Sequence, residues 1–543
     1  MKLLFPFLFS ILFLVSSCFK GEKADLIIHN AQIYSLNLHG DVFEAMAIKN
    51  GKIIELGPER EILNKYRGTT LNAEKREIYP GFYDAHAHIF GLAQKKLNCD
   101  LTGSRSLSEI ISRLERFEAQ NGSDFIIGKG WDQSLWSNNE LPDNSELNEI
   151  FPDKPVVLFR IDGHAVLANN AALQKAGIIT AQPVEGGEII INEEGLLTGI
   201  LLDNAIDLIR PILPGLSTEK LKEALLESQE ELLQYGITNI HEAGISLNDL
   251  ELLQELEEEG KLKISIYAML FPNEREMEFA KTTGVLKTDH LHVRSFKIIG
   301  DGALGSRGAC LTHPYSDAPH THGFLVQSIR EIKAIAEQAK EMGYQLNVHC
   351  IGDSTNRSVL NTMNEVIGDS KDLRWRIEHA QIVQPEDIPL FKKGGIIPSV
   401  QPTHAVSDMR FVRDRIGEKR EKWSYAYRSL LSVNGILALG TDFPVEDVNP
   451  FATIEASVNR KNLAGEPLDG YLKDESLTLE QTLRGMTIWA AMAAFEDNEQ
   501  GSLEPYKDAT FTILHNPISE AVSFGNNYAK EVFIKGTSVY RFD

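Results

Sequence analysis

Two histidines separated by one residue, His86 and His88, are the strongest chemical signal in the sequence. They end a segment that opens with Pro80 and Gly81 and reads as a buried strand. Side chains alternate faces along a strand, so both imidazoles lie on one side, about 7 Å apart at Cα, and both can reach one metal ion. An isolated pair of this kind is more often two polar residues on a half-buried strand. Here, later strand-like segments end in further potential ligands, which favours a metal site.

Four residues in those later segments have side chains that bind metals or can be converted into ligands. Lys297 lies inside an apolar segment, where burial lowers the pKa of the amine and makes it a nucleophile. His349 and His379 each end a strand-like segment, and Asp442 follows the segment 437–441. The lysine and the two histidines have ordinary alternatives, because a histidine is often a satisfied core residue and Lys297 can pair with a carboxylate such as Asp301. Their repetition at the ends of strands indicates a shared site.

The segments that carry these residues alternate with helical patterns. Strand-like runs lie at 80–88, 237–242, 263–267, 293–299, 345–349, 375–379, 396–400 and 436–439, and helical stretches include Ile329–Met342 and Leu479–Ala494. This alternation predicts a parallel sheet, and eight units predict a closed (β/α)8 barrel, an α/β fold of the TIM type. Active sites of such barrels lie at the carboxyl ends of the strands, where these polar residues stand.

Strand signals also occur at both ends of the chain. Asn50-Gly51 is a strong hairpin turn within 25–56, and strand-like runs recur at 509–514 and 531–540. Neither end alone can bury a face, so we expect both termini to form one small β-sandwich. Between about 99 and 216, mixed signals with a hairpin pattern at 186–199 predict an α+β insertion after the first barrel strand.

The run Gly-Phe-Tyr-Asp-Ala-His-Ala-His at 81–88 resembles the first-strand motif of the amidohydrolase superfamily. The longer context resembles amidohydrolase family 3, the branch of YtcJ-like and N-substituted formamide deformylase-like hydrolases. The resemblance covers nearly everything after the leader. Together with the patterns above, it divides the chain into a signal peptide at 1–17, the N-terminal part of the sandwich at 18–79, the first barrel strand at 80–98, the insertion at 99–216, the rest of the catalytic barrel at 217–498 and the C-terminal part of the sandwich at 499–543.

The resemblance also implies a complete ligand set. Its members are His86, His88, Lys297, His349, His379 and Asp442. Imidazole and carboxylate ligands fit two Zn²⁺ ions, with Mn²⁺ or Fe²⁺ as alternatives, although some superfamily members hold one ion. In many binuclear members a lysine of the fourth strand adds CO2, and the carbamate bridges the metals, so we expect a carbamate on Lys297. Asp442 is expected to bind metal and to carry the proton from the attacking water to the leaving amine.

Further polar residues are candidates for substrate contacts. Some lie in the insertion, which we expect to cover the barrel mouth, and others follow barrel strands two, four and seven. For each of them, an ordinary loop or supporting role is an equally good interpretation. The candidates are Trp131, Asp132, His164, His241, Asp301, Arg307, Gln401 and His404.

The first eighteen residues predict export. A short positive start is followed by an apolar run at 3–15, too short to span a bilayer, and by small residues before Cys18. This pattern resembles a bacterial lipobox and predicts a lipoprotein anchored through Cys18, on the outer membrane facing the periplasm or the cell surface. An ordinary secretory signal with a chance cysteine is the alternative. Cys99, Cys310 and Cys350 remain, an odd number that predicts no disulfide framework and three small buried residues.

The net charge of −23 argues against nucleic acid as a partner, because phosphate binding requires a basic surface. The expected partners are a small-molecule substrate and the membrane, with a homo-oligomer left open. The sequence predicts a metal-dependent hydrolase that cleaves a carbon–nitrogen bond, other than a peptide bond, of a small amide, N-acyl or formamide-like substrate. The alternatives are a lactone or ester hydrolase on the same metal site and an inactive, ligand-binding surface lipoprotein.

Overall fold

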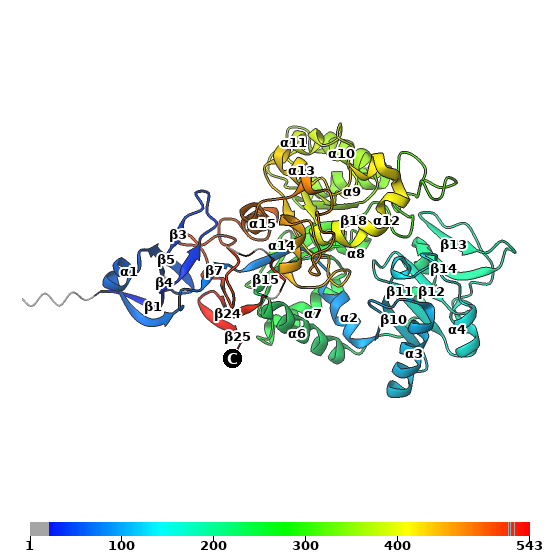
Figure 1. Cartoon of the computed structure of the whole chain (residues 1–543), viewed down its shortest axis with the longest axis horizontal. Coiled ribbons are helices and arrows are strands. Elements are labelled where there is room, and N and C mark those ends of the chain that lie inside the picture. The colour runs from blue at the N-terminus through cyan, green and yellow to red at the C-terminus, as the bar shows by residue number, and fades with distance from the viewer. Residues whose placement is uncertain (1–20, 520, 522, 526, 543) are drawn as a thin grey trace, which may run out of the picture.

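The computed structural model describes residues 21–519, 521, 523–525 and 527–542. The expected signal peptide and Cys18 lie outside the described residues. Figure 1 shows a central body of strands and helices, with the first strands of the chain on one side of it and the insertion on the other. In the described part of the chain, no helix is both long and apolar enough to cross a bilayer. Cys99 and Cys350 are buried free thiols, whereas Cys310 is only half-buried.

The central body is a barrel of eight parallel strands, as the sequence predicts. In order around the barrel they are β8 (Phe82–Ala87), β15 (Ile237–Ile245), β16 (Ser265–Leu270), β18 (Leu291–Ile299), β19 (Gln345–Cys350), β20 (Arg376–His379), β21 (Ile397–Val400) and β22 (Ala438–Leu439), with β17 (Leu286–Lys287) paired to β18 outside this path. The seam between β8 and β22 closes just beyond the strands. Asp442 N donates to His86 O over 2.8 Å, and His88 N donates to Phe443 O over 2.9 Å.

Helices connect the barrel strands. They are α2 (Ile89–Leu97), α6 (Thr218–Gln234), α7 (Leu247–Glu258), α8 (Glu274–Thr283), α9 (Ile329–Met342), α10 (Asp353–Ile367), α11 (Pro389–Gly394), α12 (Pro402–Glu421), α13 (Tyr427–Asn434), α14 (Pro450–Val458), α15 (Leu479–Gly485) and α16 (Ile488–Ala493). The helix expected over 329–342 is confirmed as α9. It starts at a capping box between Ser328 and Glu331 and ends at Gly343, whose φ is 68°.

The helix expected over 479–494 is wrong as a single element. The chain forms α15 and α16 instead, and Thr487 between them is not helical (φ −142°, ψ −98°). Gly485 packs so closely on the last barrel strand that a Cβ there would lie 2.6 Å from Leu439 Cγ. The helical pattern is therefore interrupted where the segment turns against the strand that closes the barrel.

The insertion forms a sheet of its own. Its strands lie in the order β13 (Gly187–Ile191), β14 (Leu197–Asp203), β12 (Ala165–Ala168), β11 (Val156–Arg160), β10 (Ile126–Trp131) and β9 (Cys99–Asp100), with helices α3 (Leu107–Asn121), α4 (Ser145–Ile150) and α5 (Asn170–Lys175). The antiparallel pair β13–β14 is the expected hairpin. Val157 and Leu158 belong to two different apolar clusters, because successive residues of β11 face opposite sides of this sheet.

Both termini build the remaining part of the molecule. One sheet has the order β5 (Lys52–Gly57), β4 (Ala45–Lys49), β1 (Glu22–His29) and β6 (Tyr66–Asn72), and α1 (Glu59–Lys65) precedes β6. The other has the order β25 (Thr537–Arg541), β24 (Ala529–Ile534), β23 (Phe511–Leu514), β7 (Glu77–Pro80), β2 (Gln32–Tyr34) and β3 (Val42–Phe43). Met46 and Phe511 share one buried cluster, so the two chain ends bury a common core.

Candidate metal centre

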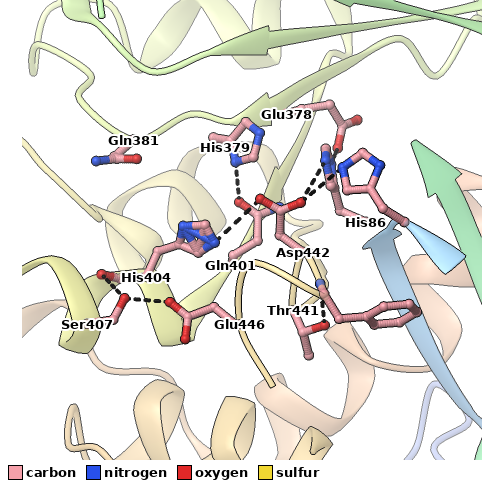
Figure 2. Close-up of polar contacts among 12 residues, drawn as sticks. His86, Glu378, His379, Gln381, Gln401, His404, Ser407, Thr441, Asp442 and Glu446 are labelled. Atoms are coloured by element: carbon pink, nitrogen blue, oxygen red, sulfur yellow. Dashed lines mark hydrogen bonds and ion pairs between the residues drawn. The ribbon is translucent and has the colours of Figure 1, made fainter. Parts of the chain in front are cut away.

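The carboxyl ends of the first and last barrel strands bring three predicted ligands together. One ligand atom each from His86, His88 and Asp442 lies within 4.8 Å of the others. Oδ1 of Asp442 is 3.1 Å from Nε2 of His88 and 3.6 Å from Nε2 of His86, and Figure 2 shows the carboxylate facing His86. Asp442 adopts a left-handed backbone conformation (φ 64°), and its N–H is part of the barrel seam. Closure of the barrel therefore also builds the site.

Three residues from the intervening strands complete the predicted set. The ring of His379 lies 4.7 Å from that of His86 and 4.4 Å from that of His349, measured between centroids. Nζ of Lys297 lies 3.2 Å from Nε2 of His86. Strands β8, β18, β19 and β20 and the turn after β22 thus bring the six side chains to one end of the barrel.

Glu378 is a residue of this centre that the sequence reasoning missed. Strict alternation along the strand would place Glu378 and His379 on opposite faces, yet both reach His86, because His379 has a left-handed backbone (φ 70°). Oε2 of Glu378 lies 2.5 Å from Nδ1 of His86, and Oε1 lies 2.7 Å from Nε of Arg376. A carboxylate on Nδ1 fixes the ring and leaves Nε2 free to bind a metal. Two charges in a short buried strand, Arg376 and Glu378, are the signal that could have revealed it.

Two other buried carboxylates position the histidine strand. Oδ2 of Asp84 accepts a hydrogen bond from Thr441 Oγ1 over 2.6 Å, which ties β8 to the residue before Asp442. Oε2 of Glu242 accepts from Ile89 N over 2.6 Å, at the start of the helix that follows His88. Burial raises the pKa of Asp84 to about 7 and that of Glu242 to about 8. Both carboxyl groups hold backbone in place without a cationic side chain as hydrogen-bond partner in the described chain.

The electrostatics of the six side chains suit a divalent cation. Burial lowers the pKa values of His86, His349 and His379 well below the ordinary value, so their lone pairs are available, and burial lowers the pKa of Lys297 to about 8. Burial alone would raise the pKa of Asp442, but the neighbouring histidines outweigh it and lower the pKa to about 2. Within the described residues, Nε2 of His349 is buried without a hydrogen-bond partner. Neutral imidazoles beside an ionised carboxylate, with an unpaired ring nitrogen, fit bound metal.

Four of the predicted substrate residues lie at this centre. Gln401 Oε1 is 2.8 Å from His379 Nδ1, and His404 Nε2 is 3.5 Å from Asp442 Oδ2, as Figure 2 shows. The ring of His164, from the insertion, lies 5.1 Å from that of His349. Asp301 also approaches His349 (3.8 Å), but it is fully buried and accepts hydrogen bonds from three backbone amides and Thr355, which makes it a structural crosslink.

The other four predicted substrate residues have structural surroundings. Trp131 is completely buried in the insertion core and donates from Nε1 to Leu158 O over 2.8 Å, which agrees with the supporting role. The expected strand end at His241 is wrong, because β15 continues to Ile245 and the ring packs inside the barrel, 2.8 Å from Arg376. Asp132 is bound by Arg160 (2.7 Å) and Arg410 (2.5 Å), and Arg307 pairs with Asp317 (2.9 Å).

A parallel eight-stranded barrel that gathers neutral histidines and an ionised aspartate at its carboxyl end has the architecture of a metal-dependent hydrolase. Comparison with known families agrees, since the model of the amidohydrolase family, Amidohydro_3, matches residues 69–540. The chain therefore belongs to the amidohydrolase family.

Several known proteins are similar over most of their length. Protein LONG AFTER FAR-RED 3 of Arabidopsis thaliana is 32% identical, over 91% of this chain and 88% of its own, and putative amidohydrolase YtcJ of Bacillus subtilis is 30% identical, over 90% and 93%. N-substituted formamide deformylase of Arthrobacter pascens is 26% identical, over 91% and 94%. The crystal structure of an uncharacterized metal-dependent hydrolase from Pyrococcus horikoshii superposes with a TM-score of 0.73 at 30% identity, covering 91% of this chain and 97% of the other.

Proposed function

We propose that this protein hydrolyses a carbon–nitrogen bond, other than a peptide bond, in a small amide, N-acyl or formamide-like substrate. The observation that carries the proposal is the position of the Asp442 carboxylate, 3.1 Å from His88 and 3.6 Å from His86 at the barrel seam. An ionised carboxylate there can accept a proton from water and return it to a leaving nitrogen. The similarity to a protein named N-substituted formamide deformylase supports the choice of bond.

The six clustered side chains would hold two divalent ions, which we take to be Zn²⁺ with Mn²⁺ or Fe²⁺ as alternatives. Bound there, such ions supply a Lewis acid for the substrate carbonyl and lower the pKa of a water molecule. We further propose that Lys297 adds CO2, because its Nζ lies among the histidines, 3.2 Å from His86 Nε2. The ammonium group first loses one proton, and the neutral nitrogen then forms a bond to the carbon of CO2 while the electron pair of one C–O π bond moves to oxygen. Loss of a second proton from nitrogen leaves an anionic carbamate, which suits a metal site.

Within this proposal, Asp442 transfers the proton, and two other residues orient the histidine rings. Asp442 takes one proton from the attacking water, whose oxygen forms a bond to the carbonyl carbon, and delivers that proton to the nitrogen as the carbon–nitrogen bond breaks. Glu378 holds Nδ1 of His86, and Gln401 holds Nδ1 of His379, so both rings present Nε2 to the site. The products are a carboxylic acid and an amine.

The first test is a hydrolysis screen on metal-loaded protein lacking the leader. The panel contains N-substituted formamides, N-acyl amino acids, aryl esters and lactones, and Asp442→Asn serves as the comparison. We expect amide or formamide turnover that falls by about 10²- to 10⁴-fold in Asp442→Asn, because the proton carrier is lost. Turnover of esters or lactones alone would refute the carbon–nitrogen assignment. Intact-mass or crystallographic detection of an unmodified Lys297 in the metal-loaded protein would refute the carbamate.

We also propose that the mature chain is lipid-anchored through Cys18, on the outer membrane. The proposal rests on the apolar run at 3–15 and the small residues before the cysteine. Mass spectrometry of the mature N-terminus from a bacterial host should find a cleaved, acylated Cys18, and Cys18→Ala should release the protein from the membrane fraction. A mature N-terminus without acyl groups would refute the lipid anchor and support the alternative, an ordinary secretory signal.

A further inference from the structure

The insertion places one of its own side chains in the candidate metal centre. His164 precedes β12 of the insertion sheet, and its ring lies 5.1 Å from that of His349 with 42° between the ring planes. The His164 side chain keeps 16% of its exposure, against 6% for His349. His164 is therefore the more exposed of the two rings, and it belongs to the insertion rather than to the barrel.

Asp203 holds the ring of His164 in one orientation. Its Oδ1 lies 2.6 Å from Nδ1 of His164, and its backbone N–H donates to the carbonyl of His164 over 3.1 Å. Asp203 is not glycine, yet its backbone has φ 47° and ψ −121°. A strained conformation of this kind persists only where the surroundings enforce it, and such residues cluster at functional sites.

The loop after the fourth barrel strand is shaped around the same carboxylate. A Cβ on Gly302 or on Gly308 would lie 2.6 Å from Asp203 Oδ2, so a larger residue at either position would displace this carboxylate. A Cβ on Gly305 would similarly lie 2.9 Å from the guanidinium of Arg160. The glycines of 300–308 thus let the barrel loop receive two polar side chains of the insertion.

We propose that His164 is a substrate-binding residue that the insertion supplies to the metal centre, with Asp203 as its positioning residue. Asp203 occupies Nδ1, so Nε2 is the ring nitrogen left to form a hydrogen bond with the amide group of the bound substrate. The proposal rests on the hydrolytic function given above and adds one side chain from a second part of the fold. It assigns the insertion a direct role in substrate recognition as well as in covering the barrel.

Two variants and their combination test this assignment in metal-loaded protein. We expect His164→Ala to bind the wild-type amount of metal and to lose roughly 10- to 100-fold in kcat/KM, the effect of one hydrogen bond to the substrate. Asp203→Asn should lose less. If Asp203 acts through His164, the double variant should be no worse than His164→Ala, because the second change removes nothing further. Additive losses would show that Asp203 acts independently of His164 and would overturn its positioning role.

A binding measurement separates this inference from the hydrolytic function. Acetohydroxamate carries an amide-like group and chelates metals, so its affinity for metal-loaded protein reports on the same contact without turnover. We expect about tenfold weaker binding to His164→Ala and unchanged binding to Lys154→Ala, a control that removes an ion pair with Glu118 elsewhere on the insertion. Wild-type affinity in His164→Ala would overturn the inference even if hydrolysis is found. Loss of metal from His164→Ala would also overturn it, because His164 would then be a ligand. A lower melting temperature with unchanged affinity would leave only a structural role.

Discussion

Charged groups lie at both ends of the barrel, but they are paired differently. At the amino-terminal end, a cavity of about 290 Å³ lies between the barrel and the terminal sandwich. Lysines line it, and Lys52 pairs with Asp508 (2.6 Å) and Lys287 with Glu499 (2.7 Å). These ion pairs crosslink parts of the fold and balance their own charge.

At the carboxyl-terminal end, the pairing is less complete. Nε2 of His349 is buried without a hydrogen-bond partner in the described chain, Oδ1 of Asp442 faces the rings of His88 and His86, and Nζ of Lys297 lies 3.2 Å from a histidine nitrogen. Because unpaired buried polar atoms are costly, this arrangement suits a bound cation. The same residue types thus crosslink the fold at one end of the barrel and gather into a candidate metal centre at the other.

The largest effect is expected from removing ligands at the carboxyl-terminal end. His86→Ala combined with His88→Ala should reduce bound divalent metal, measured per chain by plasma mass spectrometry, and should lower hydrolysis by at least about 10³-fold, because the polarising cation is lost. Full metal content and activity in this variant would show that these histidines do not bind metal, and the proposed difference between the two ends would not hold.

The next effect concerns Glu242, a buried carboxyl group that has no cationic side chain as hydrogen-bond partner in the described chain. The pKa of Glu242 rises from 4.5 to about 8 in the folded chain, so the folded protein keeps a proton that the unfolded chain releases. The free energy of unfolding therefore falls as the pH rises from 4.5 to 8, by on the order of 3 kcal/mol. Glu242→Gln retains the acceptor for Ile89 N and should flatten this dependence, as measured by urea unfolding at pH 5 and pH 8. An unchanged slope would show that Glu242 is ionised in the folded state.

A smaller effect is expected where a carboxylate orients a ligand. Glu378→Gln should weaken metal binding by about 10- to 100-fold, because Nδ1 of His86 loses its charged partner. Competition with a chelator of known affinity measures this change. Asp408→Asn is a suitable control, since Asp408 bonds to Tyr425 rather than to a predicted ligand. Equal losses in both variants would contradict a specific role for Glu378.

The smallest effect is expected at the paired end. Lys287→Ala removes a half-exposed ion pair with Glu499 and should lower the free energy of unfolding by less than about 1 kcal/mol, with unchanged kcat/KM. Thermal melting and steady-state kinetics measure the two quantities. A clear loss of activity would mean that the cavity at the amino-terminal end of the barrel is coupled to the metal centre. The two ends would then not be functionally distinct.

Local patterns in the sequence were sufficient for much of the fold. The hairpin at Asn50-Gly51, the helix Ile329–Met342 and all eight barrel strands follow from turn chemistry, capping and periodicity, which act over a few residues. The ligand candidates could be predicted for the same reason, because strand ends in a barrel share one face. The split near Thr487 could not, since neighbouring Gly485 packs closely on Leu439, which is far away in the chain, and no local pattern records that contact.

By itself, the sequence determined which residue types stand at the strand ends, and therefore the family and the class of chemistry. Only the tertiary structure decided which of them meet. Glu378 reaches His86 because the backbone of His379 breaks the alternation, and Trp131 turns into the insertion core although its position along the chain suggested the mouth. The physical reason is that side-chain direction at a strand end and docking of a separate sheet depend on contacts made across the whole fold, which no local pattern records.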